Sequence, residues 1–477
     1  MVFSSTVFMF VFLPLVLGGY YLLGHFIKWK RFRNVFLLVA SLGFYAWGEP
    51  KFVFVMIASI LLNYFYALGI DRYREKRTLS KSILVLMVVT NIAIFFVFKY
   101  LGFAVQNINY ITGQSIKIPQ IALPIGISFF TFQSMSYVID VYRGNGKVQK
   151  NPLDLGVYVA FFPQLIAGPI VRYETIAEQI DNRKENWTDF CEGLERFVIG
   201  MGKKVLLSNS LAIIADRGFN YIEYNDVSIL MAWLGAVCYT LQIYYDFSGY
   251  SDMAIGLGKM FGFQFEENFN YPYVASSVTD FWRRWHISLS TWFRDYVYIP
   301  LGGSRVKPAR HIFNLFVVWS LTGVWHGASW NFIWWGWFYF ILLVFEKFTG
   351  IPEKVNSKAV KVIYRIFTII MVTLGWVLFR AENLSQALLY MQKMFGVAGN
   401  HLIDDKALYI LFDNKVILII SLICATPLIK KIGEVLNGKN ERLSVSLLKY
   451  ILLIAIFMLC LCAIAVSTYN PFIYFNF

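Results

Sequence analysis

The sequence predicts an all-α protein that crosses a membrane many times. Hydrophobic residues make up 58% of the 477 residues, and charged residues only 15%. This composition is typical of a polytopic membrane protein and excludes an ordinary soluble fold. Apolar runs close to the length of a bilayer-spanning helix, about 20 residues, recur between short basic loops. Because no internal repeat or long linker is visible, we expect residues 1–477 to form one membrane domain.

Five apolar runs near the start of the chain are expected to be membrane spans. They cover residues 7–23, 34–47, 52–68, 83–101 and 121–142. The next run, 155–173, is interrupted by Pro163, Gly168 and Pro169. We expect it to be a re-entrant or interfacial segment, because broken backbone at membrane depth needs protein or water to satisfy its polar groups.

The remaining runs lie on both sides of a central stretch, 281–337. Before it we expect an amphipathic segment, a short apolar run and a span that ends in polar residues, at 187–204, up to 214, and at 229–245. After the start of the central stretch, spans are expected at 330–345, 366–379, 416–428 and 447–466. The chain as a whole should make about ten to twelve crossings.

The positive charge of the chain is interpreted as a topology signal. Lys and Arg outnumber Asp and Glu by 43 to 29, a net charge of +14, but they lie in short loops between apolar runs. Cytoplasmic loops carry such an excess, so we do not expect nucleic-acid binding. The loop after the first run contains Lys28, Lys30, Arg31 and Arg33, which favours an N-terminus outside. The first run lacks a basic leader and a cleavage site, and we expect it to be retained as a span.

The five cysteines predict neither disulfides nor a metal site. Four of them lie within apolar runs, and the sequence contains no C-x-x-C pair and no metal-ligand spacing. Buried free thiols are the expected state.

Residues 281–299 are expected to form one amphipathic helix at the membrane interface. Helical spacing places on one face Trp282, Trp285, Leu289 and Trp292. A second face carries Arg283, His286, Ser290 and Arg294. Two interpretations of the arginines remain open: they extend to lipid phosphates, or they bind an anionic donor group.

Two histidines of the central stretch are candidates for chemistry. His326 lies well inside an apolar run, where an ionisable group costs about 2.5 kcal/mol or more. A neutral imidazole there can take a proton from a hydroxyl group that attacks an acyl carbon. We expect Gly323 and Gly327 to leave space for a substrate beside the ring. The alternatives are a core histidine bonded to a backbone carbonyl for His326, and an ordinary interfacial histidine for His286.

Long motifs in the central stretch resemble a known family. Residues 282–305 have the sequence WRRWHISLSTWFRDYVYIPLGGSR, and residues 324–336 the sequence VWHGASWNFIWWG. They resemble the membrane-bound O-acyltransferase superfamily, in the bacterial branch of the alginate O-acetyltransferase membrane subunit and the teichoic acid D-alanyl transfer protein. The resemblance to this branch extends to segments 122–144, 161–173, 242–263, 268–273 and 467–477.

The resemblance implies a fold and a set of site residues. The fold is a ring of transmembrane helices, with re-entrant and interfacial helices, around a thin partition that a tunnel crosses. His326 matches the catalytic histidine, as general base or transient acyl carrier. His286 matches the second polar position, which would orient the thioester carbonyl or relay the proton. The implied partners of donor phosphates are Arg283, Arg284 and Arg294.

Further candidates for binding substrate or donor are Ser290, Trp285, Trp325, Gln242, Tyr245 and Asp246. For the last three, and for Ser248, a polar end of a membrane span is the alternative.

The function implied by the resemblance is acyl transfer across a bacterial cytoplasmic membrane. An acetyl group would move from a cytoplasmic thioester, with acetyl-CoA as donor substrate and no bound cofactor, to an exported or cell-wall polysaccharide such as alginate. A membrane-anchored or periplasmic partner of the SGNH, serine-esterase-like type would complete the transfer. One alternative is D-alanyl transfer to teichoic acid from a carrier-protein thioester. Another is a transporter or channel, which also needs broken helices and buried polar groups.

Overall fold

The computed structural model describes residues 1–27, 29, 31–220, 227–354, 357–437, 443–466 and 469–473. Every regular element in these ranges is a helix, which confirms the predicted all-α fold. Two residues of the first basic loop, Lys28 and Lys30, lie outside the described ranges, as do residues 467, 468 and 474–477 of the tail.

The chain divides into two compact units, Met1–Phe197 with Tyr250–Glu266, and Val198–Gly249 with Glu267–Phe477. Helices α10 (Trp187–Gly202) and α12 (Ile229–Met260) contribute residues to both. The single domain expected from the sequence stays a prediction.

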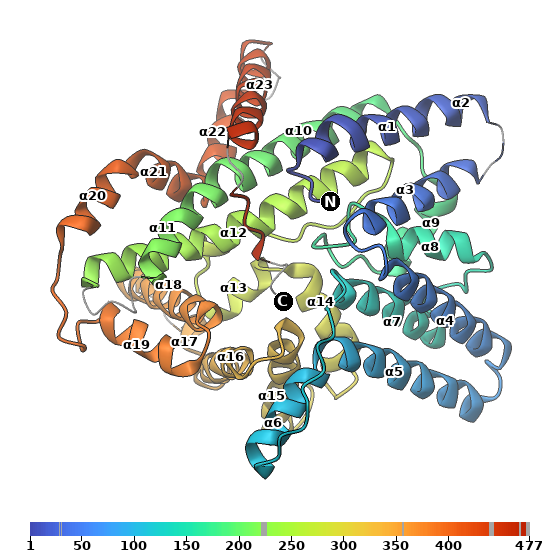
Figure 1. The fold of residues 1–477 in the computed structure, drawn as a ribbon, viewed down its shortest axis with the longest axis horizontal. Coiled ribbons are helices and arrows are strands. Elements are labelled where there is room, and N and C mark those ends of the chain that lie inside the picture. Colours follow the sequence, from blue (N-terminus) through green and yellow to red (C-terminus); the bar gives the residue numbers. More distant parts are fainter. Residues whose placement is uncertain are drawn as a thin grey trace. The chain divides into compact units, whose positions relative to one another are not determined.

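The first unit otherwise contains η1 (Phe8–Phe12), α1 (Leu13–Gly18), η2 (Gly19–Leu23), α2 (Gly24–Phe26), α3 (Phe32–Gly48), α4 (Val53–Arg72), α5 (Arg77–Lys99), α6 (Leu101–Thr112), α7 (Ile127–Arg143), α8 (Pro152–Ala160) and α9 (Tyr173–Asn182). The α-helices are labelled in Figure 1. The second unit otherwise contains η3 (Lys203–Ser208), α11 (Asn209–Asn220), η5 (Pro272–Val274), α13 (Val278–Arg284), α14 (Ile287–Phe293), η6 (Arg294–Tyr298), α15 (Pro308–His326), α16 (Trp330–Thr349), α17 (Ile351–Lys354), α18 (Lys358–Arg380), α19 (Leu384–Met394), α20 (Asp405–Asp413), α21 (Lys415–Cys424), α22 (Leu428–Asn437) and α23 (Leu443–Val466). Of the η elements, η5 is a 3-10 turn and the others are π-helical.

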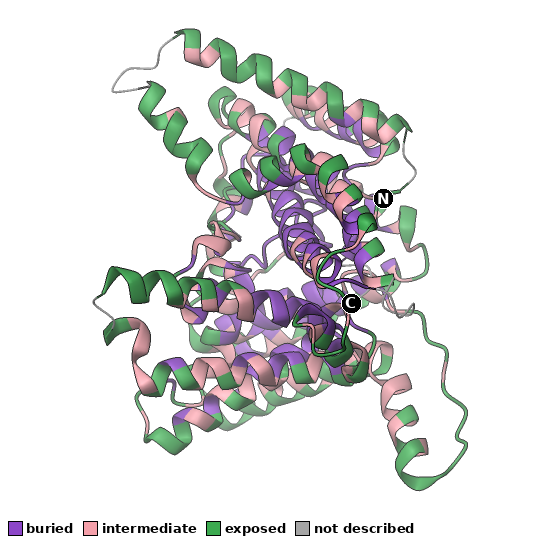
Figure 2. Ribbon diagram, turned by 90° about the vertical axis from the view of Figure 1, so that its left-hand side faces the viewer, coloured by how far each residue is buried: buried purple, intermediate pink, exposed green. Residues whose placement is uncertain are grey.

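Seven helices among the described residues are long and apolar enough to cross a membrane, or eight if the bent pair α20 and α21 is one span. They are Phe8–Phe26, Val53–Arg72, Arg77–Lys99, Trp187–Asn220, Trp330–Thr349, Lys358–Arg380 and Leu443–Val466. The chain is therefore a multi-pass membrane protein, as predicted. The number falls below the expected ten to twelve partly because α3 and α7 have only 17 residues each. Figure 2 shows exposed residues along whole helices, and only 6% of the apolar window of α23 is buried.

Three expected boundaries are wrong. The expected span 121–142 becomes helical only at Ile127, after Gly126 takes a left-handed conformation with φ 75°. The expected end of a span at Tyr245 lies in the middle of α12. The polar residues Asp246, Ser248 and Ser251 that follow it are buried, and the helix continues to Met260. Residues 187–214, expected as an amphipathic segment and a short apolar run, belong to the continuous 34-residue span candidate Trp187–Asn220.

The proline- and glycine-rich segment of the first unit is irregular, as predicted. Helix α8 ends at Ala160, and no helix forms again until Tyr173. Residues 161–171 are all buried. Protein groups satisfy polar atoms here: the hydroxyl of Tyr158 donates to the carbonyl of Val171 at 2.9 Å, and the backbone N–H of Phe162 to the hydroxyl of Ser41 at 3.0 Å. Its re-entrant placement in a membrane stays a prediction.

Helices α15 and α16 of the second unit pack backbone to backbone through glycines. A Cβ atom on Gly323 would lie 2.4 Å from the carbonyl oxygen of Phe332, and one on Gly336 2.4 Å from that of Trp319. A Cβ on Gly327 would lie 2.2 Å from the Phe332 ring. The expectation that Gly323 and Gly327 make room for substrate is therefore wrong, because α16 fills that space.

Candidate active site

The helix expected over 281–299 is broken at His286. Helix α13 ends at Arg284, Trp285 is extended, and His286 has a left-handed backbone with φ 43° before α14 begins. The two separate faces expected from helical spacing therefore do not form. A residue with a Cβ atom in this conformation is strained and persists where its surroundings hold it, often at functional sites.

Asn268 provides the surroundings that hold the break. Its backbone oxygen accepts a hydrogen bond of 2.9 Å from the N–H of Ile287. Its side-chain Oδ1 accepts from the backbone N–H of Ser288 at 3.2 Å and from the Ser288 hydroxyl at 2.9 Å. The same oxygen lies 3.1 Å from Nδ1 of His286. One asparagine thus binds both the backbone of the break and the imidazole.

A buried carboxylate holds the start of α13. Glu346 on α16 accepts hydrogen bonds from the backbone N–H groups of Val278 and Thr279, at 2.7 and 2.8 Å, and from the Thr279 hydroxyl at 2.7 Å. The Tyr364 hydroxyl donates to it at 2.8 Å. The first N–H groups of a helix lack partners within the helix, and a negative charge there is favourable. The span expected to end at residue 345 thus continues through Glu346, which fixes the helix that leads to His286.

His326 was expected well inside an apolar run, but in the structure it is the last residue of α15. Gly327 is extended, and α16 begins at Trp330, so the apolar run folds into a helical hairpin. The imidazole is 6% exposed. The rings of Trp335 and Phe379 meet it edge to face, with centroids at 4.9 and 5.1 Å. The imidazole is thus packed between aromatic rings.

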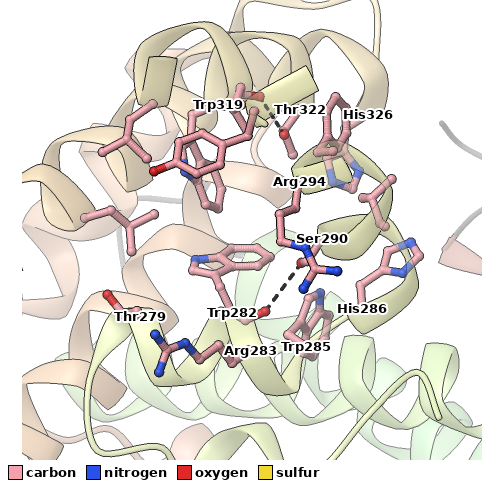
Figure 3. Close-up of a pocket in the computed structure, with 16 residues that line it drawn as sticks. Thr279, Trp282, Arg283, Trp285, His286, Ser290, Arg294, Trp319, Thr322 and His326 are labelled. Atoms are coloured by element: carbon pink, nitrogen blue, oxygen red, sulfur yellow. Dashed lines mark hydrogen bonds between the residues drawn. The ribbon is translucent and has the colours of Figure 1, made fainter. Parts of the chain in front are cut away.

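Both histidines line one cavity of about 240 Å³ in the second unit. Of the predicted site residues, it is lined by Arg283, Trp285, His286, Ser290, Arg294 and His326. Figure 3 shows the two imidazoles on one side of this cavity, next to Arg294, with Arg283 and Thr279 farther from them. Arg283 and Arg294 are exposed, whereas both histidines are buried. The cavity therefore extends from exposed guanidinium groups to buried imidazoles.

The remaining predicted residues lie outside the cavity lining. Trp325 is buried between the two histidines, with ring centroids 6.0 Å from His286 and 4.8 Å from His326. Arg284 forms an ion pair of 2.8 Å with Asp280 and also binds the carbonyl of Asn270 at 3.3 Å. Trp325 therefore supports the imidazoles, and Arg284 supports the α13 region.

The predicted site residues on α12 are buried, and two of them bind distant parts of the chain. Tyr245 donates its hydroxyl to the carbonyl of Ser421. Asp246 forms an ion pair of 2.5 Å with Lys204, and its Oδ2 accepts from the N–H of Ile473 at 2.8 Å. Gln242 is 3% exposed. The structure thus shows tertiary contacts for Tyr245 and Asp246 away from the cavity.

Several residues of the site were not identified from the sequence. Asn268 was noted only as part of a motif, and no sequence periodicity connects it with His286. The cavity is also lined by Thr279, Trp282, Tyr298, Trp319 and Thr322. The density of tryptophans over residues 282–337 is the available signal, since Trp282, Trp285 and Trp319 all line the cavity.

Burial determines the charge state of His286. It lies between α13 and α14, outside the helices long enough to span a membrane. Burial lowers the pKa of His286 to about 3, because a charged imidazolium is poorly solvated there. The ring is therefore neutral near pH 7 and has one nitrogen available as a hydrogen-bond acceptor.

Comparison with known proteins identifies the family. Residues 149–384, which include the whole cavity lining, match MBOAT, the membrane-bound O-acyltransferase family. The probable alginate O-acetylase AlgI of Pseudomonas aeruginosa is 44% identical over 402 residues, which cover 83% of this chain and 75% of that protein. The chain belongs to the membrane-bound O-acyltransferase family. It is thus an O-acyltransferase, as the sequence resemblance predicted.

The chain is also similar to two relatives whose names give other acceptors or acyl groups. The peptidoglycan O-acetyltransferase of Helicobacter pylori is 34% identical across 100% of this chain and 98% of that protein. The teichoic acid D-alanyltransferase of Bacillus subtilis is 31% identical over 244 residues, 49% of this chain and 60% of that protein. The roles of the individual site residues stay predictions.

Proposed function

We propose that this acyltransferase acetylates hydroxyl groups of an exported or cell-wall polysaccharide, using acetyl-CoA or another acyl thioester as donor substrate. The observation that carries the proposal is one cavity lined by two buried imidazoles, His286 and His326, and two exposed guanidinium groups, Arg283 and Arg294. Two relatives are named as an alginate O-acetylase and a peptidoglycan O-acetyltransferase, which supports acetyl as the transferred group and a polysaccharide as the final acceptor. The enzyme acts in the bacterial cytoplasmic membrane, with its N-terminus outside.

His326 acts as general base in this proposal. The acceptor hydroxyl oxygen attacks the thioester carbonyl carbon while the imidazole takes the hydroxyl proton. The C–S bond then breaks, and the imidazolium returns its proton to the leaving thiolate. In the alternative route an imidazole nitrogen attacks the carbonyl carbon first, the C–S bond breaks, and the thiolate leaves with the ring proton. The acceptor hydroxyl then attacks the acyl group, the acyl–nitrogen bond breaks, and the hydroxyl proton returns to the ring. Because a thioester is already activated, the protein has only to position it, move a proton and stabilise the oxyanion. His286 orients the carbonyl or relays the proton.

The two exposed arginines of the cavity bind the phosphates of the donor. Guanidinium groups pair with phosphate oxygens through two parallel hydrogen bonds. Arg294 also pairs with Asp295 at 2.7 Å. Arg284 is not assigned to the donor, because it lies outside the cavity lining. No bound cofactor enters this scheme, because the thioester is a substrate.

A partner protein completes the transfer. A cavity of about 240 Å³ whose lining includes three indole rings suits an acyl group and a short hydroxyl-bearing side chain better than a polysaccharide chain. A membrane-anchored or periplasmic partner of the SGNH, serine-esterase-like type supplies such a hydroxyl and passes the acetyl group to the polymer.

D-alanyl transfer to teichoic acid is the second candidate function. The observation that favours it is the D-alanyltransferase relative, but that match covers only about half of this chain. Its donor is a carrier-protein thioester. Membranes that contain this enzyme distinguish the two when supplied with labelled acetyl-CoA or with a labelled D-alanyl carrier protein.

The deciding experiment replaces His326 by Ala and follows label from acetyl-CoA into polysaccharide. We expect acetylation to be lost while membrane insertion stays normal. His401→Ala is the matched control, because His401 is exposed and outside the cavity lining. Acetylation that survives His326→Ala would contradict the proposal. Transport of an intact solute without acyl transfer would favour a transporter instead.

A further inference from the structure

We infer that Asn268 is a positioning residue that holds His286 in one tautomer, with the proton on Nδ1 and the lone pair of Nε2 available to the cavity. His286 then accepts a proton during acyl transfer and does not donate a hydrogen bond to the thioester carbonyl. The inference rests on the proposed function and chooses between the two roles that it leaves open for His286.

The orientation of the Asn268 amide is fixed by a donor of known identity. The backbone N–H of Ser288 can only donate, and it points at the Asn268 side chain at 3.2 Å. The atom that meets it must therefore be the amide oxygen, because an NH₂ group there would place two donors against each other. The Ser288 hydroxyl donates to the same oxygen at 2.9 Å.

The orientation of the amide then sets the tautomer of the imidazole. Nδ1 of His286 lies 3.1 Å from the Asn268 oxygen, which has no proton to give. Nδ1 must therefore carry the proton and donate it. In a neutral ring the other nitrogen, Nε2, then has a free lone pair. Nε2 is buried and has no hydrogen-bond partner among the described residues, on a ring that lines the cavity.

This tautomer decides what His286 does. A group that polarises a carbonyl must offer an N–H, and only Nε2 is left to face a substrate. With a lone pair there, His286 receives a proton from the acceptor hydroxyl or from His326. Backbone contacts strengthen the arrangement, since Ile287 donates to the backbone oxygen of Asn268 at 2.9 Å. Asn268 therefore controls both the conformation at the break and the proton position.

Besides Asn268, the Ser288 hydroxyl lies 3.4 Å from Nδ1 of His286, and aromatic rings pack against the imidazole. Phe247 on α12 meets its ring edge to face with centroids at 4.5 Å, and Trp325 on α15 lies 6.0 Å away. The charged or titratable side chains that line the same cavity are Arg283, Arg294, Tyr298 and His326. The only neutral amide bonded to the ring in the described residues is that of Asn268.

The test compares Asn268→Leu, Asn268→Asp and the control Asn270→Ala in the full-length enzyme. Asn270 is exposed and two residues away from Asn268. Leucine keeps the size but cannot accept a hydrogen bond, so we expect kcat for acetyl transfer to fall at least about tenfold with little change in KM for acetyl-CoA. Aspartate still accepts from Nδ1, so it should restore much of kcat. Its charge should also raise the pKa of His286, so that activity is lost at a higher pH than in the wild type.

The second readout is direct and independent of activity. In ¹⁵N-histidine spectra, the signals of His286 are assigned with His286→Gln. We expect a protonated Nδ1 in the wild type and in Asn268→Asp, and a mixture of tautomers in Asn268→Leu. A wild-type proton on Nε2, or an unchanged tautomer in Asn268→Leu, would overturn the inference. A changed tautomer with unchanged kcat would overturn the acceptor role of His286, whereas the proposed function itself fails only if His326→Ala retains acetylation.

Discussion

The carboxylate of Glu346 accepts a hydrogen bond of 2.8 Å from the backbone N–H of Thr279. Glu346 belongs to a helix apolar enough to span a membrane, and Thr279 to the first turn of the short helix that leads to His286. A buried carboxylate in such a helix is costly unless hydrogen bonds compensate it. Here four donors compensate it, and three of those hydrogen bonds hold the first turn of α13 in place.

Replacing Glu346 by Ala should therefore impair both stability and activity. It leaves the first N–H groups of α13 without partners in a buried place, which costs about 1–3 kcal/mol per group. We expect a lower thermal midpoint in detergent and a large loss of acetyl transfer. Thr279→Val removes only the hydroxyl bond and should cost less in both measurements. Equal effects of the two variants would show that the helix start does not depend on the carboxylate.

Arg283 and Arg284 are neighbours in sequence but should differ in effect. Arg283 lines the cavity, whereas Arg284 pairs with Asp280. Arg283→Gln should raise KM for acetyl-CoA roughly tenfold, because one charge-assisted contact to phosphate is worth about 1.5–3 kcal/mol. Arg284→Gln should leave KM nearly unchanged. Initial rates over a range of acetyl-CoA concentrations measure both, and a reversed order would place the donor phosphates elsewhere.

Gly323→Ala should separate α15 from α16. The new methyl group would meet the Phe332 carbonyl oxygen at 2.4 Å, and backbone cannot move as a side chain can. Overpacking of this kind costs about 1–3 kcal/mol. Gly43→Ala is a control, because nothing lies within 4 Å of its added Cβ. We expect a reduced thermal midpoint for Gly323→Ala only, with lower activity because His326 ends the displaced helix.

The low pKa of His286 should make the fold sensitive to acid. In the unfolded chain the imidazole takes up a proton as pH falls below its usual pKa of 6.5, whereas in the folded protein it stays neutral down to about pH 3. The unfolded state thus binds more protons between these values, so the free energy of unfolding decreases as the pH is lowered from 6.5 towards about 3. His286→Gln should weaken this dependence. Thermal midpoints of both proteins at pH 7.5 and pH 5 measure it, and equal drops would exclude His286 as the cause.

The sequence predicted the residues of the site better than their arrangement. The predicted motif around His326 and the cluster from Arg283 to Arg294 both contribute residues to the cavity lining. They could be predicted because ionisable groups in apolar runs indicate function. The spacing rule failed at His286, since a strained backbone conformation held by Asn268 breaks the helix. Neither Asn268 nor Glu346 was predictable as a support, because each acts on a distant segment and nothing local distinguishes it from an ordinary polar residue.

The ion pair between Lys204 and Asp246 also has a consequence for biosynthesis. Asp246 accepts from the N–H of Ile473, 227 residues later in the chain, and Lys204 donates to the carbonyl of Pro471. The ribosome makes Pro471 and Ile473 more than 200 residues after Lys204 and Asp246. Lys204 and Asp246 therefore cannot gain these partners until residues 471–473 have been made, so this part of the second unit closes late during folding.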